Sequence, residues 1–186
     1  MRAPSAPRPA TRIAAGDKRD ICQNAIDLLH VLGVELPRVA VLAAVETVNA
    51  NMPTTLDAAA LTVMAARGQI TGALVDGPLA FDNAISFAAA KTRQINSPVA
   101  GQADILLVAG LDAGNMLAKQ LVHFAGADAA GLVLGARLPI IVTSRANSAH
   151  ARLASAALAK LAAERASRSS GWLASAVASC SNTPLI

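Results

Sequence analysis

The chain has 186 residues, of which 54% are hydrophobic and 2% aromatic, and its formal net charge is +4. A chain of this length forms one domain of ordinary size and buries enough surface to need no disulfide or metal for stability. The basic excess lies in terminal arginines, and residues 17–165 carry no net charge. Because a nucleic-acid interface needs a clustered basic face and stacking rings, the composition argues against one.

The two ends of the chain differ in composition from the domain predicted between them, residues 17–166. Residues 1–16 combine arginines with prolines and predict a disordered basic tail, whereas residues 167–186 are rich in serine and have no clear periodicity. No apolar run reaches the roughly 18–20 residues of a membrane span, so we expect no membrane partner. The two cysteines match no metal or redox spacing, which indicates idle thiols in the reducing cytoplasm.

The predicted elements between these tails alternate between helices and strands. In chain order they are a helix at 17–32 ended by Gly33, a strand at 38–44, a helix at 54–68 capped by Thr54 or Thr55 and closed by Gly68, a strand at 70–76, a short helix near 85–92, a strand at 103–109, a helix at 112–126 with an apolar stripe of Leu117, Leu121 and Phe124, strands at 129–135 and 138–144, and a helix at 147–165. The strands are continuous apolar runs, which indicates a sheet covered on both faces. We therefore predict an α/β fold, a layered αβα sandwich with a mostly parallel sheet.

Polar residues follow several of these strands, where ligands bind in open α/β sheets. The segment "DGPLAFDNAIS" begins with Asp76, and Gly77-Pro78 predicts a sharp turn. Asp82 and Asn83 can cap the helix that follows, and for Asp82 capping and a role at a ligand remain equally open.

The segment "LDAGNML" opens the helix at 112–126. Asp112 is a natural N-cap, but capping does not explain Gly114 and Asn115 in the first turn, where a glycine costs about 1 kcal/mol. A glycine allows close approach to the backbone, and an asparagine presents an amide at the helix mouth.

The segment "PIIVTSRANS" places Ser144 and Arg145 between a predicted buried strand and a helix. Unpaired N–H groups at a helix N-terminus favour an anion, and the arginine adds a bidentate fork for phosphate or carboxylate. The alternative is a capping serine beside a surface arginine. No phosphate-binding loop, dinucleotide fingerprint, nucleophile elbow or metal-ligand cluster occurs in the sequence.

Several blocks of the chain resemble the phosphate acetyltransferase/phosphate butyryltransferase family, and the butyryl-type branch most closely. They include "MPTTLDAAALTVMAARGQITGALVDGPLAFDNAIS", "AGNMLAKQL" and "GARLPIIVTSRANS", and the resemblance runs from about residue 20 to 163. It implies a fold similar to the second domain of the isocitrate/isopropylmalate dehydrogenase-like proteins.

The resemblance also implies the conversion of acyl-CoA and phosphate into acyl phosphate and CoA, without a metal or a resident cofactor. CoA is then a substrate, and the protein is expected to form a homodimer. By this resemblance, Ser144 and Arg145 match the catalytic serine and arginine of the family. Gly114, Asn115 and Ser148 line the cleft, and Asp76, Asp82 and Asn83 belong to the loop opposite.

Two positions depart from the family pattern, since Asn147 replaces a common aspartate and Ala151 stands where acetyl-type relatives carry an aspartate base. The family enzymes also have two domains, and the resemblance covers only the second. We therefore expect a chain without the N-terminal half, weakly active or inactive alone.

There are two alternatives to the phosphate acyltransferase. The first is a non-catalytic remnant or interaction domain that retains the fold and a dimer surface. The second is a metal-dependent decarboxylating dehydrogenase of the same architecture, but this needs clustered aspartates, and Asp76 and Asp82 are too few.

Overall fold

The computed structural model describes residues 15–136, 138–145 and 147–168 of the chain. Its predicted tails, residues 1–16 and 167–186, lie almost wholly outside this range. The elements in chain order are α1 (Ala15–Val31), β1 (Arg38–Leu42), α2 (Pro53–Ala66), β2 (Leu74–Leu79), α3 (Phe81–Ile85), α4 (Phe87–Thr92), β3 (Ile105–Leu107), α5 (Leu111–Phe124), β4 (Leu132–Val133), β5 (Ile140–Ile141) and α6 (Ala149–Arg168). This order confirms the predicted alternation, with the short helix near 85–92 divided into α3 and α4.

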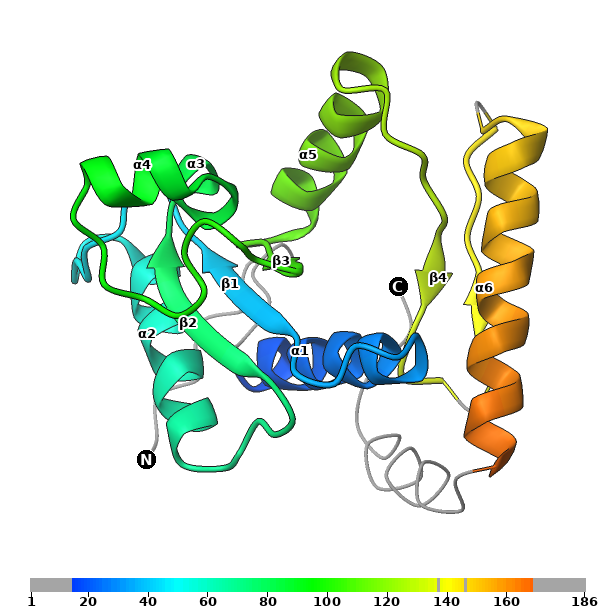
Figure 1. The fold of residues 1–186 in the computed structure, drawn as a ribbon, viewed down its shortest axis with the longest axis horizontal. Coiled ribbons are helices and arrows are strands. Elements are labelled where there is room, and N and C mark those ends of the chain that lie inside the picture. Colours follow the sequence, from blue (N-terminus) through cyan, green and yellow to red (C-terminus); the bar gives the residue numbers. More distant parts are fainter. Residues whose placement is uncertain (1–14, 137, 146, 169–186) are drawn as a thin grey trace, which may run out of the picture.

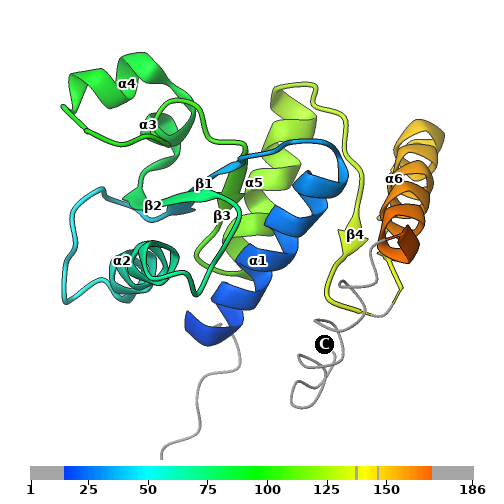
Figure 2. The same cartoon turned by 60° about the horizontal axis from the view of Figure 1, so that its bottom comes forward.

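The first half of the described chain, up to β3, contains a three-stranded parallel sheet in the order β2-β1-β3. Helices α1 and α2 lie on one side of this sheet and α3 and α4 on the other, as Figures 1 and 2 show from two directions. The predicted αβα layers and parallel strands are therefore confirmed for this part of the chain. All three strands are shorter than predicted, and β2 begins four residues later than the strand expected at 70–76.

The core follows the alternation of side chains along β1, in which successive residues point to opposite faces of the sheet. Val39 and Val41 pack into a cluster with Cys22 and Ile26 of α1 on one face. On the other face Ala40 and Leu42 join a second cluster, which also contains Leu79, Ala84, Ala90, Val99 and Ala100. Burial on both faces explains why the strand reads as a continuous apolar run.

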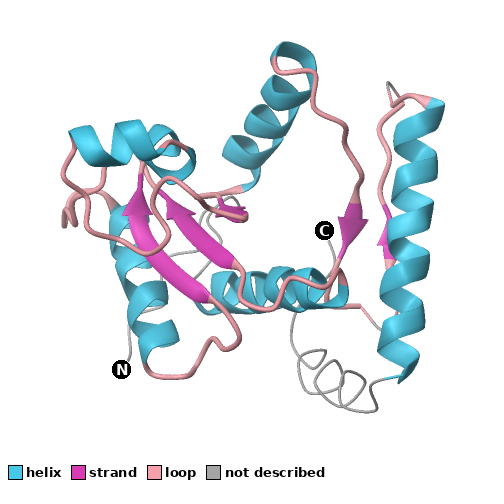
Figure 3. Cartoon of the chain, viewed as in Figure 1, coloured by secondary structure: helices cyan, strands magenta, loops and turns pink. Residues whose placement is uncertain are grey.

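The second half of the chain departs from the predicted single sheet. Strands β4 and β5 form a separate two-stranded antiparallel pair, which lies beside α6 (Figure 3). The strand predicted at 138–144 was expected to be buried, but Ile140 and Ile141 remain 46% and 45% exposed. That prediction was wrong because an apolar β-branched run reports the preference for a strand and not the presence of a partner that covers it.

Two helix ends match the glycines predicted to terminate them. Gly33 and Gly68, which follow α1 and α2, have φ values of 94° and 72°, the left-handed region in which glycine is favoured. The predicted caps were wrong. Helix α2 begins after Met52 without a side-chain cap, and the Thr55 hydroxyl instead donates to the carbonyl of Asn49 and accepts from its N–H. Helix α5 begins after Gly110, so Asp112 lies within its first turn.

The turn predicted at Gly77-Pro78 is also wrong, since both residues belong to β2 and their peptide bond is cis. Gly77 is required by close approach to β1, because a Cβ there would lie 2.7 Å from the Val41 carbonyl oxygen. The apolar stripe of α5 is only partly inward. Leu117 packs against the second cluster, whereas Phe124 is 88% exposed.

Candidate functional site

A cavity of about 370 Å³ lies between α5 and the segments that lead from α5 and into α6. Its size is that of a small-molecule site. Figure 1 shows α5 and α6 on either side of the segment that carries β4. The lining residues come from α5, from the loop after it and from the entry to α6: Asn115, Ala118, Lys119, Val122, His123, Ala127, Asp128, Ala129, Ser144, Asn147, Ser148 and Ala151.

The entry to α6 is a closed turn that supports one wall of this cavity. The Ser144 N–H donates to Asn147 Oδ1 at 2.9 Å, and the Asn147 N–H donates back to the Ser144 carbonyl at 3.0 Å. Ser148 then caps α6, because its hydroxyl accepts from the Ala151 N–H at 3.1 Å. The remaining first-turn N–H groups and the positive end of the helix dipole make this wall favourable to an anion.

Three of the residues predicted for the site are brought together here. Asn115 lies on the α5 wall, and Ser144 and Ser148 lie on the α6 wall. Ser148 is predicted to bind substrate, and in the structure its hydroxyl caps α6. Arg145 is exposed, and no ion pair of the described residues involves it. It follows Ser144 directly but is absent from the cavity lining that the structure describes.

Sequence reasoning missed Lys119 and His123, which line the cavity from the next two turns of α5. Together with Asn115 they recur every four residues, which places them on one face of a helix. The four-residue spacing of these polar side chains is present in the sequence, but the prediction for this helix rested on its apolar stripe alone. At the cavity rim, Asp128 Oδ1 lies 3.4 Å from His150 Nδ1 in the first turn of α6.

Gly114 has a packing explanation. A Cβ at this position would lie 3.0 Å from Val108 Cγ2, which is tighter than ordinary van der Waals contact. The glycine therefore allows the first turn of α5 to approach the segment that follows β3.

The other predicted site residues lie on β2 and α3, outside the described lining of the cavity. Asp76 is partly buried, and its Oδ1 accepts from the Gly77 N–H at 2.9 Å. Asn83 is fully buried, and neither polar atom of its side-chain amide has a hydrogen-bond partner. Asp82 is exposed in the first turn of α3, and Ser86 rather than Asp82 caps the helix that follows, α4.

Asp82 belongs to an exposed charge cluster at the carboxyl ends of β1 and β2. Arg93 lies 2.9 Å from Glu46 Oε1 and 3.6 Å from Asp82 Oδ2. The hydrogen bond from Arg93 lowers the pKa of Glu46, and the same bond raises the pKa of Arg93. The cluster therefore consists of two carboxylates held by one guanidinium.

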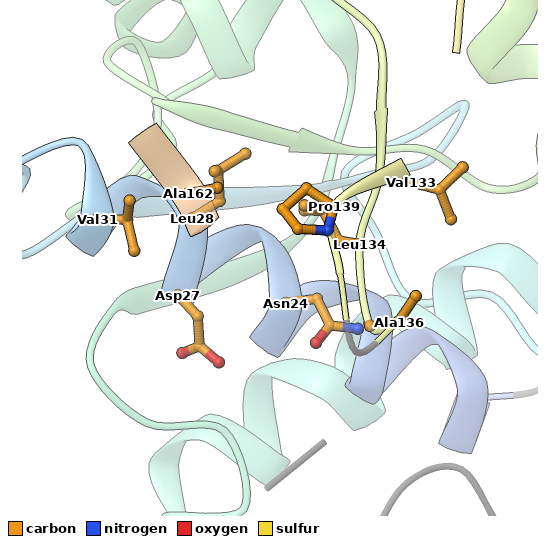
Figure 4. Close-up of a pocket in the computed structure, with 10 residues that line it drawn as sticks. Asn24, Asp27, Leu28, Val31, Val133, Leu134, Ala136, Pro139 and Ala162 are labelled. Atoms are coloured by element: carbon orange, nitrogen blue, oxygen red, sulfur yellow. The ribbon is translucent and has the colours of Figure 1, made fainter. Parts of the chain in front are cut away.

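A second cavity, between α1, the β4–β5 connection and α6, is too small for a substrate. Its volume is about 20 Å³, which suits roughly one water molecule. Figure 4 shows that Leu28, Val31, Pro139 and Ala162 give it an apolar lining, with the amide of Asn24 turned toward Ala136.

The described residues contain no group of three or more His, Cys, Asp or Glu side chains able to hold a metal ion. Within the same residues, no helix is both long and apolar enough to cross a membrane.

The fold and cavity thus define an α/β protein with a cavity lined by both polar and small apolar side chains. The family model described as "Phosphate acetyl/butaryl transferase" matches residues 11–160, so the chain belongs to the phosphate acetyl/butyryl transferase family.

Individual relatives agree with this family. The phosphate acetyltransferase of Rhizobium meliloti is 64% identical over 148 residues, which are 80% of this chain and 47% of that protein. A probable phosphate butyryltransferase of Bacillus subtilis is 53% identical over 146 residues, which are 78% of this chain and 49% of that protein. The chain thus spans about half the length of the curated relatives it matches.

Among solved structures, a branched-chain phosphotransacylase from Enterococcus faecalis superimposes with a TM-score of 0.74 at 32% identity. The match covers 81% of this chain and 54% of that chain.

Proposed function

We propose that this chain supplies one wall of a phosphate acyltransferase active site, which interconverts acyl-CoA and phosphate with acyl phosphate and CoA. The observation that carries the proposal is the cavity that joins Asn115 of α5 to Ser144 and Ser148 at the entry to α6, in a chain of this family. A phosphate dianion suits a wall made of hydroxyl groups and a helix N-terminus.

The proposed chemistry is direct transfer of the acyl group. A phosphate oxygen forms a bond to the acyl carbonyl carbon, and the carbon–sulfur bond breaks with its electron pair on the CoA sulfur. The protein positions the reactants and stabilises the developing oxyanion. In this proposal Ser144 donates a hydrogen bond to the reacting oxygen, and Arg145, its neighbour in the chain, clamps the anion with its guanidinium fork. The residues of the β2–α3 segment (Asp76, Asp82 and Asn83) form the opposite side of the cleft, and Gly114 supports the position of Asn115.

The remaining parts of the proposal concern the whole protein. We propose that residues 17–166 form one domain of the isocitrate/isopropylmalate dehydrogenase-like type, that no cofactor is bound permanently, and that the protein is a cytoplasmic homodimer. The exposed apolar residues of β5 and its flank support the dimer, because Ile140, Ile141 and Val142 are 46%, 45% and 51% exposed.

The test is phosphate-dependent release of CoA from acetyl-CoA and from butyryl-CoA, followed with a thiol reagent. It is run on the 186-residue chain alone and with the N-terminal half of a relative added in trans. We expect little turnover by the chain alone and a marked increase in the mixture. The Arg145→Ala variant should lose most of this activity, and a mixture that stays inactive with both substrates would contradict the proposal.

A second candidate is a non-catalytic remnant that retains the dimer surface. The exposed apolar face of β5 favours it as much as it favours a dimeric enzyme. Sedimentation of the purified chain measures the association, and the complementation assay decides between the two candidates.

A further inference from the structure

Lys119 lines the cavity and is not among the residues that the sequence predicts for the site. It lies one helical turn after Asn115 on α5 and lines the same cavity as Ser144 and Ser148 on the opposite wall. Residues four apart share a helix face, so the two side chains extend from α5 side by side. The exposed side chain of Lys119 therefore forms part of the wall that faces the entry to α6.

Lys119 is the one lysine or arginine among the residues that the structure describes in the lining of this cavity. Arg145 is absent from the described lining, and the other charged or titratable lining groups are Asp128 and His123. Asp128 Oδ1 contacts His150 Nδ1 at 3.4 Å, and no ion pair among the described residues involves Lys119. Its positive charge is thus available to a ligand that enters between α5 and α6.

We propose that Lys119 binds the reacting phosphate, opposite the Ser144 hydroxyl and the N-terminus of α6. A lysine suits this task because its ammonium is a compact charge with three donors, which adapts to a phosphate that changes position as the acyl group moves. It takes no proton and forms no bond in the transfer. This inference rests on the proposed function and adds to it the group that holds phosphate on the α5 side.

Lys119 could instead bind a phosphate group of CoA. Steady-state kinetics distinguishes this from binding of the reacting phosphate. In the complemented enzyme, Lys119→Ala should raise the KM for phosphate roughly tenfold or more, as expected for loss of a charged hydrogen bond. The KM for acyl-CoA should stay within about twofold, and Lys119→Arg should recover part of the phosphate affinity. The matched control is Lys160→Ala, since Lys160 is exposed on α6 and lies 3.7 Å from Glu164.

A rise in the KM for acyl-CoA instead of phosphate would overturn the inference, as would no change in either constant, and both results would leave the proposed function standing.

A binding measurement keeps the two proposals distinct if no turnover is found. The unfolding midpoint of the chain is measured against inorganic phosphate, with chloride at the same ionic strength as reference. A ligand of the folded state raises this midpoint with its concentration. We expect phosphate to stabilise the parent and Lys160→Ala alike but not Lys119→Ala. Equal stabilisation of the parent and both variants, or of none of the three, would overturn the assignment of Lys119.

Discussion

The hydroxyl of Ser155 joins α6 to the β4–β5 pair through Gly131. It accepts from the Gly131 N–H at 3.0 Å and donates to the Ala151 carbonyl at 2.8 Å, and Ser155 is fully buried. Val142 donates to the Gly131 carbonyl on the other side at 3.0 Å. Gly131 is required here because a Cβ would collide with the Val142 carbonyl oxygen. One hydroxyl thus connects α6, whose N-terminus lines the cavity, to the strand pair β4–β5.

Replacement of Ser155 by alanine should lower the free energy of unfolding by about 1–3 kcal/mol, because the Gly131 N–H loses its partner. Denaturant unfolding measures the change. Thr92→Ala is the matched control, since the Thr92 hydroxyl donates to the Ala88 carbonyl at 2.9 Å in an exposed helix and holds no second element. Equal midpoints for the two variants would show that the Ser155 bond contributes nothing.

The buried ion pair between α1 and α2 should be sensitive to loss of its cation. Lys18 Nζ lies 2.9 Å from Asp57 Oδ2, and the two side chains are 5% and 12% exposed. Lys18→Met should lower the free energy of unfolding by about 3–5 kcal/mol, because it removes the ammonium that pairs with the buried Asp57 carboxylate. Lys18→Met combined with Asp57→Leu should recover most of this loss.

Arg19→Met is the control for that experiment, since Arg19 pairs with Asp20 on the exposed side of α1. Surface pairs contribute roughly 0–1 kcal/mol. If Lys18→Met proves no more costly than Arg19→Met in thermal unfolding, the buried pair is not a stabilising element.

The thiol of Cys22 should resist modification in the folded protein. Burial raises its pKa to about 11 from an ordinary value of 9.0, so at pH 8 it remains protonated and enclosed. In a Cys180→Ser background, a disulfide reagent should react slowly with the native chain and rapidly in denaturant. Rapid reaction of the native thiol would contradict the burial seen in the first core cluster.

The same shift predicts how stability depends on alkaline pH. Above about pH 9 the unfolded chain loses the thiol proton and the folded chain keeps it, so the free energy of unfolding falls as the pH rises toward 11. Denaturant midpoints between pH 8 and 11 should show this slope for the parent and a weaker one for Cys22→Ala. Identical slopes would remove Cys22 as the cause.

The carboxylate of Glu46 should titrate at a higher pH once Arg93 is removed. Arg93 donates to it at 2.9 Å and lowers its pKa, so the interaction stabilises the fold above the ordinary pKa of a glutamate and is lost as the pH falls through the lowered value. Carbon-detected NMR of Glu46 in Arg93→Gln gives the midpoint directly. Lys91→Gln, in the last turn of α4 that Arg93 follows, should leave that midpoint in place, and an unchanged midpoint in Arg93→Gln would contradict the pairing.

Much of the fold could be predicted because its signals are local. The run from Val39 to Leu42 is apolar and contains two β-branched valines, and Gly33 and Gly68 mark the ends of helices by a backbone conformation that glycine favours. The exposure of β5 could not be predicted, because the identity of Ile140 and Ile141 carries no information about whether a neighbouring element covers them.

The site was predicted less completely, for a related reason. Ser144 and Asn115 stand at helix mouths, which the sequence reveals, and the structure places both on one cavity. The position of Lys119 depends on the rotation of α5 about its axis, and in the structure Leu117 of this helix packs against the second core cluster. The substrate contacts of all these residues, including Asp76, Asp82 and Asn83, stay predictions.

The distribution of buried side chains gives the two halves of the chain different resistance to local opening. Among the described residues after Val108 only Ser155, Ala159 and Ala162 are buried, and all three are small. Amide hydrogens of α5 and α6 should therefore exchange with deuterium through partial opening, while those of β1 await global unfolding. The cavity lies in the part of the chain after Val108, where local opening is expected first. Binding of a ligand there should slow the exchange of amide hydrogens in α5 and α6 and leave exchange in the parallel sheet unchanged.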